Sequence, residues 1–150
     1  MKNLKKVLAL VLVVAMMASF AVSAGAASFT DNDKIVYNDA VKLLSTLEVV
    51  NGFTDGSFNP EGNVTRAQTA KMIAYIMNGG ADASSSFASS AKFNDVANGY
   101  WAANSIGYCA TKEIVAGAGN NLYYPNNDVT GVQLAKMALV ALGYDPTIEK

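Results

Sequence analysis

Histidine is absent from the 150-residue sequence, which also has a single cysteine, Cys109, and a single arginine, Arg66. Without histidine, the usual zinc sites, the triads that depend on imidazole and the commonest general base are excluded. The carboxylates are scattered over predicted helix starts and turns, so the sequence offers no evident pair for glycoside hydrolysis. We therefore predict neither an enzyme active site, nor a metal site, nor a cofactor.

The one cysteine also limits how this chain is held together. A single thiol cannot form an intramolecular disulfide. Cys109 lies among apolar residues of a predicted helix, which indicates a buried, inert thiol rather than a nucleophile. Packing, not a disulfide framework, must therefore stabilise the fold.

Positive charge is sparse and concentrated at the N-terminus. The chain has 11 basic and 12 acidic residues, and three of the lysines are Lys2, Lys5 and Lys6. The remainder is therefore acidic and has no basic patch of the kind that binds nucleic acid. We expect partners to be recognised by a specific pocket and not by bulk charge.

The N-terminal segment has the pattern of a secretory leader. The three lysines precede an uncharged apolar run over residues 7–22, and Ala24 and Ala26 form an Ala-x-Ala cleavage pattern. The run is shorter than the roughly 20 apolar residues that span a bilayer. We predict a signal peptide over residues 1–26, export of the remaining chain and no membrane association after cleavage.

The rest of the sequence is a duplication. When the chain is shifted by 65 positions, residues 36–77 align with their copies without a gap, and Ala70-Lys71-Met72 recurs as Ala135-Lys136-Met137. Such a repeat indicates a tandem architecture. We place repeat 1 at 28–78 and repeat 2 at 92–145. Between them, residues 79–91 are Gly/Ser-rich and predict a flexible linker with nothing to bury.

Each repeat is predicted to form a helix, a loop and a second helix. In the first helices, apolar residues recur at helical spacing; they are Val36, Ala40, Leu43, Leu44 and Leu47 in repeat 1 and Ala102, Ile106, Cys109 and Ala110 in repeat 2. The second helices have apolar faces of the same kind, made of Ala67, Ala70, Ile73, Ala74 and Met77, and of Val132, Ala135, Leu139 and Leu142.

Turn and cap residues mark the boundaries of these helices. Gly52 and Gly117 follow the first helices and suit a left-handed turn that ends them. Thr65-x-x-Gln68, repeated in the second copy as Thr130-x-x-Gln133, is a capping box that starts the second helix. Asp31 and its counterpart Asp95 are expected to cap the first helices, in preference to a ligand contact.

The predicted class is all-α, with tandem helix–loop–helix repeats packed as a small bundle. One repeat buries too little apolar surface to be stable alone. We therefore expect the repeats to pack on one another or on neighbouring chains.

Taken together, these motifs resemble the S-layer homology (SLH) domain. Repeat 1 supplies the loop Gly52-Phe53-Thr54-Asp55-Gly56-Ser57-Phe58-Asn59-Pro60 and the helix start Val64-Thr65-Arg66-Ala67, while repeat 2 supplies Phe93-Asn94-Asp95 and Trp101-Ala102. The resemblance implies a non-catalytic module of a surface protein that anchors it to secondary cell-wall polysaccharide, often pyruvylated, at the bacterial cell surface. It also implies three repeats in a pseudo-threefold bundle, of which two are present here.

The resemblance implies a glycan site centred on the arginine of the second-helix start. We expect Arg66, Thr65, Gly52, Asp31 and Trp101 to contribute to it. A guanidinium fork suits a carboxylate, and the helix N-terminus adds amide donors. An arginine at a helix start is also often a solvated charge, and Trp101 suits core packing at least as well as sugar stacking.

Repeat 2 departs from the family pattern. Gly131 stands where repeat 1 has Arg66, and Asn120-Asn121 replaces the Asp-Gly turn, whereas Val36 of repeat 1 replaces Trp101. We expect repeat 2 to be structural or divergent in ligand. Copies of the chain or a third repeat would complete the bundle, and residues 146–150 read as the start of a linker or of a missing C-terminal region.

Two other functions remain open. The chain could be a structural surface-layer subunit that acts mainly by self-assembly, with little glycan binding. A calcium-dependent docking module is a weaker alternative, because counting from Asn51 puts Phe53 at the third position and Gly62 at the twelfth, where a calcium loop needs oxygen ligands.

Overall fold

The computed structural model describes residues 28–88 and 93–144. The leader predicted over residues 1–26 and the chain end at 146–150 lie outside these ranges. The elements are η1 (Asn32–Lys34), α2 (Asn38–Thr46), α3 (Arg66–Met77), η2 (Ser85–Phe87), α4 (Ala103–Thr111) and α5 (Gly131–Ala141). The described residues form no strand, only an isolated bridge between Thr65 and Asp128, so the all-α prediction is confirmed. None of the described helices is long and apolar enough to span a membrane.

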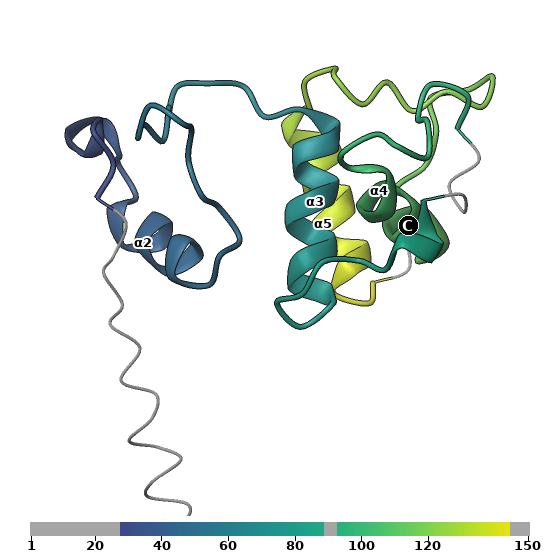
Figure 1. The fold of residues 1–150 in the computed structure, drawn as a ribbon, viewed down its shortest axis with the longest axis horizontal. Helices are drawn as coiled ribbons and strands as arrows, with labels where there is room; N and C mark the ends of the chain where they lie inside the picture. Colours follow the sequence, from purple (N-terminus) through teal and green to yellow (C-terminus); the bar gives the residue numbers. More distant parts are fainter. Residues whose placement is uncertain (1–27, 89–92, 145–150) are drawn as a thin grey trace, which may run out of the picture.

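The described chain has two parts, joined by an extended segment (Figure 1). The N-terminal lobe, residues 28–62, contains η1 and α2, and the C-terminal bundle, residues 65–88 and 93–144, contains the other elements. In the bundle, α3 of repeat 1 packs against both α4 and α5 of repeat 2. The two repeats are therefore interlocked, since repeat 1 contributes its second helix to the core of repeat 2.

Both helices that begin with a predicted capping box have one. In α3, Thr65 Oγ1 accepts from the Gln68 amide at 3.2 Å, and Gln68 Oε1 accepts from the Thr65 amide at 2.8 Å. Thr130 and Gln133 form the same pair of bonds at the start of α5. Each box satisfies amides that a helix start otherwise leaves unpaired.

Small side chains set the packing distance inside the bundle. Ala67, Ala70 and Ala74 line one face of α3 and are buried against Ile106 and Cys109 of α4. Alanines allow two helix backbones to approach closely, so large residues of the partner helix fill the space. The apolar faces predicted for α3 and α4 are thus largely confirmed.

The N-terminal lobe has a much smaller core, made of Phe29, Ile35 and Val41 with Phe58 packed against it. The apolar face predicted for the first helix of repeat 1 is wrong, because four of its five residues are exposed and the fifth, Leu44, is only partly buried; the exposed ones are Val36, Ala40, Leu43 and Leu47. The reason lies in the arrangement of the repeats: no helix of the described chain packs closely on α2.

The first helices do not end at the glycines. The α2 helix ends at Thr46 and is followed by the left-handed residue Glu48, with φ 57°. Glu113 has the same role after α4, with φ 59°. The glycine prediction is therefore wrong: Gly52 is left-handed but lies later, in the loop, and Gly117 is not left-handed.

Part of the Gly/Ser-rich segment is packed, contrary to the expectation that it has nothing to bury. Ala83 is buried, and the Phe87 ring lies edge-on to Tyr108 with 5.3 Å between centroids. A Cβ at Gly107 of α4 would lie 1.7 Å from the Phe87 carbonyl oxygen. Glycine is therefore required there for the segment to lie against α4.

Candidate functional site

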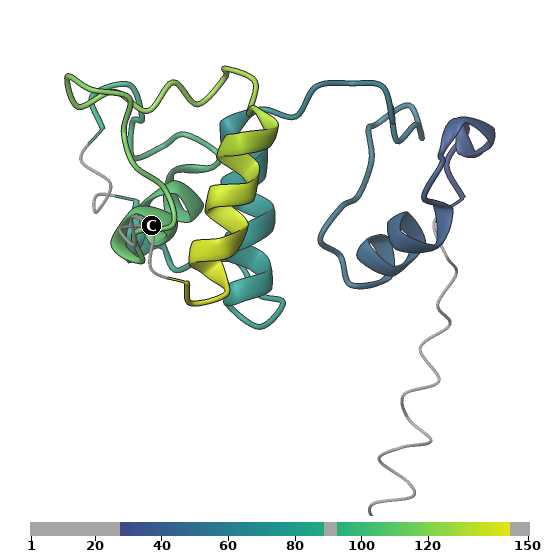
Figure 2. The same cartoon turned by 180° about the vertical axis from the view of Figure 1, so that it is seen from behind.

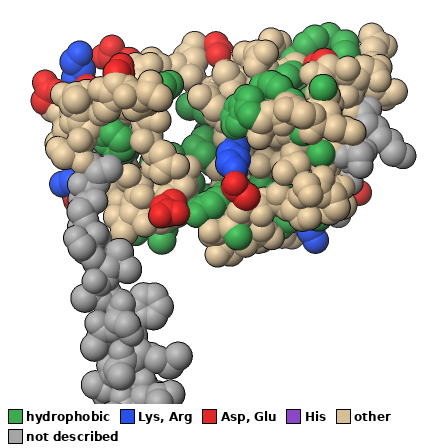
Figure 3. Space-filling model, in the orientation of Figure 1, with side chains coloured by type: hydrophobic (Ala, Val, Ile, Leu, Met, Phe, Trp, Pro, Cys, Tyr) green, Lys and Arg blue, Asp and Glu red, His purple; other side chains and the backbone are tan. Residues whose placement is uncertain are grey.

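A groove of about 460 Å³ lies between the N-terminal lobe and the C-terminal bundle. Figure 3 shows hydrophobic side chains on both sides of the hollow between the two parts. The lining combines aromatic, aliphatic and amide side chains with one lysine; its members include Asn51, Gly52, Phe53, Phe58, Pro60, Asn63, Gln68, Lys71, Met72 and Trp101. Such a mixture provides apolar faces and hydrogen-bonding groups together.

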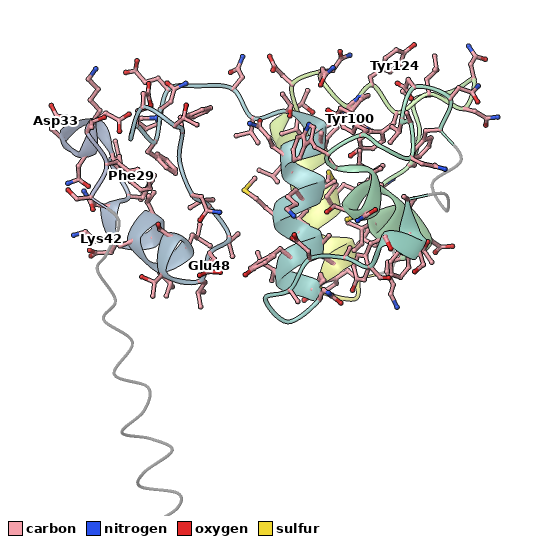
Figure 4. All side chains as sticks on the ribbon, in the orientation of Figure 1. Phe29, Asp33, Lys42, Glu48, Tyr100 and Tyr124 are labelled. Atoms are coloured by element: carbon pink, nitrogen blue, oxygen red, sulfur yellow. The ribbon has the colours of Figure 1, made fainter. Side chains whose placement is uncertain are left out.

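Trp101 is an exposed aromatic residue of this groove, as is Phe53 on the lobe side. The Trp101 side chain is 57% exposed, so the core-packing interpretation is wrong. The ring leans on Tyr100 with 5.7 Å between centroids, and the Tyr100 hydroxyl donates to Asn126 at 2.9 Å. Figure 4 shows Tyr100 on the side of the bundle that faces the lobe. The pair therefore presents a supported aromatic surface to the groove.

Gly52 also lines the groove, and the loop geometry requires a glycine there. Its φ is +68°, and a Cβ would lie 2.5 Å from the Phe29 ring and 2.6 Å from the Ser57 carbonyl oxygen. The next residue, Phe53, donates its amide to the same carbonyl at 2.8 Å. Gly52 thus shapes the lobe side of the groove.

The Asp31 carboxylate binds the backbone of the loop that contains Phe58 and Asn59, and it does not cap a helix. Its two carboxylate oxygens accept from the amides of Phe58 and Asn59, each at 2.8 Å, and it makes no side-chain cap bond to η1. The Phe58 amide is the main cause that lowers the pKa of Asp31 below its ordinary value of 3.8. Asp95 makes the same double contact with the amides of Tyr123 and Tyr124, at 2.8 and 2.7 Å. The capping prediction is wrong for both.

Arg66 lies at the contact between the repeats. Its Nε donates to the Tyr123 carbonyl at 2.9 Å, and its Nη2 donates to the Ala116 carbonyl at 3.1 Å. The guanidinium carbon is 4.4 Å from the centroid of the Tyr123 ring, and the Tyr123 hydroxyl donates back to the Arg66 carbonyl at 3.0 Å. Arg66 is therefore held by repeat 2 and is not a freely solvated charge. Its Nη1 has no hydrogen-bond partner among the described residues.

The predicted site residues divide into three places. Gly52 and Trp101 come together in the groove. Thr65 and Arg66 occupy the start of α3 and point into the capping box and the repeat contact. Asp31 is outside the groove lining and is hydrogen-bonded to the Phe58 amide of the loop. The structure thus brings two of the five residues into one hollow.

Lys71 is a groove residue that sequence reasoning did not select. Its ammonium forms an ion pair with Asp82, and it lines the groove together with Gln68. Nearby, the Tyr75 hydroxyl contacts the Glu48 carboxylate across the two parts at 3.4 Å. Burial, followed by the Glu48 charge, raises the pKa of Tyr75. The sequence feature that could have identified Lys71 as a site residue is its place in the recurring Ala-Lys-Met run.

Cys109 is buried beneath α3, with its sulfur 3.5 Å from the Ala70 carbonyl. Burial raises the pKa of this thiol to about 12, so the prediction of an inert thiol is confirmed. Among the described residues, no group of three or more His, Cys, Asp or Glu side chains is arranged to hold a metal ion.

Comparison with known proteins identifies the family. The model of the S-layer homology domain matches residues 28–70 and 92–135, so this chain belongs to that family. The "Cell surface protein" of Thermoanaerobacter kivui is 34% identical over 150 residues, which cover 96% of this chain and 19% of that protein. The "Surface layer protein" of Brevibacillus choshinensis is 30% identical over 151 residues, 98% of this chain and 13% of that protein.

A third relative matches a shorter stretch of this chain. The "Cellulosome-anchoring protein" of Acetivibrio thermocellus is 33% identical over 85 residues, which cover 56% of this chain and 19% of that protein. The chain thus spans no more than about a fifth of the length of these three relatives. No solved structure matches it significantly. The family and its relatives place the chain at the bacterial cell surface, as the sequence predicted.

Proposed function

We propose that this chain is a non-catalytic module that anchors a secreted surface protein to the cell wall by binding an acidic secondary wall polysaccharide. The observation that carries the proposal is the groove between the lobe and the bundle, with exposed Trp101 on one side and the Gly52 loop on the other. The family relationship and the named anchoring relative support it.

The chemistry of the groove suits a sugar chain. Aromatic faces such as Trp101 pack on the apolar face of a sugar ring, and the amides of Asn51, Asn63 and Gln68 provide donors and acceptors for hydroxyls. The Lys71 ammonium lies at the groove wall and is paired with Asp82; it has three donors, so it can also donate to a sugar oxygen. An acidic glycan can therefore bind an acidic protein through local contacts.

Arg66 lies at the start of α3 and outside the groove lining, so we propose that it meets an acidic group of the glycan beside the groove. Two carbonyls and the Tyr123 ring fix the guanidinium, and the unbonded Nη1 remains to meet a carboxylate. A charge held in place binds an anion without the entropic cost of ordering a long side chain. This role of Arg66 adds selectivity for acidic sugars to the proposed anchoring, and an experiment of its own tests it.

Isothermal titration of purified wall polysaccharide into the chain from Ser28 onward tests the proposal. We expect saturable binding that Trp101→Ala weakens about five- to tenfold, the loss typical of one aromatic contact. Tyr144→Ala removes another exposed aromatic residue that lies outside the groove lining, and it should bind like the wild type. Absence of binding by the folded wild type would contradict the proposal.

A second comparison isolates Arg66. Polysaccharide stripped of its acidic groups should bind the wild type more weakly than the native polymer does. Arg66→Lys keeps the charge but loses the planar fork, so this variant should discriminate less between the two polymers. Lys112→Ala, which removes an exposed cation at the end of α4, is the control and should discriminate as the wild type does. Unchanged discrimination in Arg66→Lys would mean that Arg66 only joins the repeats.

Self-assembly within a surface layer is the second candidate function. The exposed apolar residues of α5 favour it.

A further inference from the structure

Asparagine is followed directly by glycine at three places in the sequence, which are Asn51-Gly52, Asn78-Gly79 and Asn98-Gly99. Such a pair is chemically labile, because glycine has no Cβ to shield its backbone nitrogen from the asparagine side chain. The reaction joins the glycine nitrogen to the side-chain carbon of the asparagine. Its rate therefore depends on whether the asparagine amide and the glycine N–H are held by other groups, and the structure shows that the pairs differ in this respect.

The pair at Asn78 is held on both sides. The Asn78 Nδ2 donates to the carbonyls of Ala81 and Asp82, each at 3.1 Å, and the Gly79 amide donates to the Ile76 carbonyl at 3.2 Å. The side chain would have to lose two hydrogen bonds, and the glycine amide a third, before the two groups could meet. We therefore expect this pair to react slowly while the end of α3 is folded.

The pair at Asn51 has none of these restraints. Within residues 28–88 and 93–144, neither the Asn51 side chain nor the Gly52 amide has a hydrogen-bond partner, and both residues are exposed. The hydrogen bonds of the preceding turn end at the Val50 amide, and those of the following loop begin at the Phe53 amide. The pair is thus an unbonded link between two bonded turns, and its side chain can rotate towards the glycine nitrogen.

A second labile pair in the same loop shows that exposure alone does not decide. Asp55-Gly56 can close the same ring, but Asp55 Oδ1 accepts from the Ser57 amide at 3.0 Å and from the Ser57 hydroxyl at 2.7 Å. The Gly56 amide donates to the Phe53 carbonyl at 3.0 Å. The Ser57 amide is the main cause that lowers the pKa of Asp55, and an ionised carboxylate is a poor target for a nitrogen nucleophile. Asn51 therefore belongs to the open pair of this loop.

We propose that Asn51 is a site of spontaneous deamidation, at which a neutral amide of the groove lining becomes a carboxylate. The Gly52 nitrogen loses its proton and attacks Asn51 Cγ. The new N–Cγ bond closes a succinimide ring, while the Cγ–Nδ2 bond breaks and the nitrogen leaves as ammonia. Water then opens the ring at either carbonyl. The products are aspartate and isoaspartate, and in isoaspartate the backbone runs through the former side chain and is longer by one carbon.

Both products alter the groove. Each adds a negative charge to a lining in which, among the described residues, the charged side chain is Lys71, itself paired with Asp82. Isoaspartate also displaces Gly52, whose place beneath the Phe29 ring tolerates no side chain. An acidic glycan should therefore bind the deamidated chain more weakly. This consequence alone rests on the proposed function, because the modification itself is measured without glycan.

Peptide mapping by mass spectrometry, on the chain from Ser28 onward incubated at mildly alkaline pH, tests the proposal. We expect Asn51 to deamidate several times faster than Asn78 in the folded protein. Asn98, whose pair is also exposed and makes no hydrogen bond among the described residues, should react like Asn51. In urea the three sites should react at similar rates, because the bonds that hold Asn78 are lost. If Asn51 reacts no faster than Asn78 in the folded protein, the proposal is wrong.

The products and one variant test the route. Direct hydrolysis of the side chain gives aspartate alone, whereas opening of the succinimide gives isoaspartate as well, so isoaspartate should appear at Asn51. Asn51→Gln lengthens the side chain and disfavours closure of the ring. This variant should lose the reaction at residue 51 and keep the reaction at Asn98, which serves as the internal reference. Aspartate without isoaspartate at Asn51 would contradict attack by the Gly52 nitrogen.

The consequence for the groove has its own measurement. Asn51→Asp introduces the charge without the longer backbone, and we expect it to bind acidic wall polysaccharide about two- to fivefold more weakly, as for one exposed charge pair. Asn98→Asp adds the same charge outside the groove lining and should bind like the wild type. A wild type that does not bind would contradict the proposed function and leave the deamidation result standing. Equal binding by Asn51→Asp and a wild type that does bind would contradict the effect on the groove.

Discussion

At residue 52 the loop turns through a left-handed conformation beneath the ring of Phe29, and no side chain fits there. The sequence indicated a special glycine at this position, but it assigned Gly52 to the helix end. The helix instead ends earlier, where Glu48 adopts positive φ. Local propensity cannot distinguish these places, because the close approach of Phe29 is a tertiary contact.

Gly52→Ala should destabilise the N-terminal lobe. The new methyl group meets both the Phe29 ring and the Ser57 carbonyl, and the left-handed conformation adds backbone strain, for a total of about 2–4 kcal/mol. Chemical-shift changes and urea unfolding followed at Phe29 and Val41 would measure it. Gly99→Ala, at a glycine with open space around it, should be nearly neutral, and equal effects would contradict this account of the loop.

Asp31 and Asp95 show why a recurring motif can be found and still be misinterpreted. The aromatic-x-Asp pattern is visible in both repeats, and local rules assign such an Asp to the helix that follows. The structure instead joins each carboxylate to amides 27–29 positions away. Sequence separation of that size leaves no local signal, so only the repetition could hint at a shared long-range role.

Acidification should loosen the lobe through Asp31. Because bonds from the Phe58 and Asn59 amides lower its pKa in the folded state, ionised Asp31 stabilises the lobe above the ordinary value of 3.8. That contribution is lost as the pH falls through the lower, folded-state pKa. Amide chemical shifts of Phe58 and Asn59 should therefore move at a pH below 3.8. In Asp31→Asn those shifts should show no such titration; a titration that persists would assign the effect to another group.

At the scale of elements, local sequence predicted where helices begin better than it predicted which faces are buried. Both capping boxes form as expected because their partners lie three residues apart. The apolar faces of α3 and α5 have the same pattern, yet within the part of the chain that the structure describes only the α3 face is covered. Burial depends on whether a partner is present, and periodicity does not contain that information.

The reactivity of the Cys109 thiol measures whether α3 stays packed on α4. The thiol is buried against the Ala70 carbonyl, and its pKa is raised to about 12. Both effects keep the reactive thiolate scarce at pH 8. We expect a thiol reagent to modify native protein only at the rate at which α3 lifts from α4, and to react at once in urea. Fast modification of the native chain would contradict the buried contact.

At the scale of the whole molecule, one helix of repeat 1 belongs to the core of repeat 2. Repeat 1 gives α3 to the core of repeat 2 and keeps only a small lobe, whose core has three buried residues. The sequence predicted repeats that pack on one another or on neighbouring chains, and in the structure α3 of repeat 1 packs on α4 and α5 of repeat 2. The sequence could not predict that the repeats interlock. A duplication identifies each helix–loop–helix repeat, but it does not show which helices of the two repeats pack together.

This arrangement places the groove between the lobe and the helix that leaves it. Gly52, in the first half of repeat 1, and Trp101, in repeat 2, meet there across about fifty residues of sequence, so the predicted site is divided between repeats. Arg66 supports the same contact from the start of α3. A wall ligand in this groove would touch both repeats at once.

Cosedimentation with cell-wall sacculi tests the central claim most directly. The chain from Ser28 onward should pellet with intact sacculi and remain in solution once the secondary polysaccharide has been stripped from them. Trp101→Ala should pellet less than the wild type, and Tyr144→Ala should match it. A folded wild-type chain that pellets equally with intact and stripped sacculi, or with neither, would contradict anchoring through the wall polysaccharide.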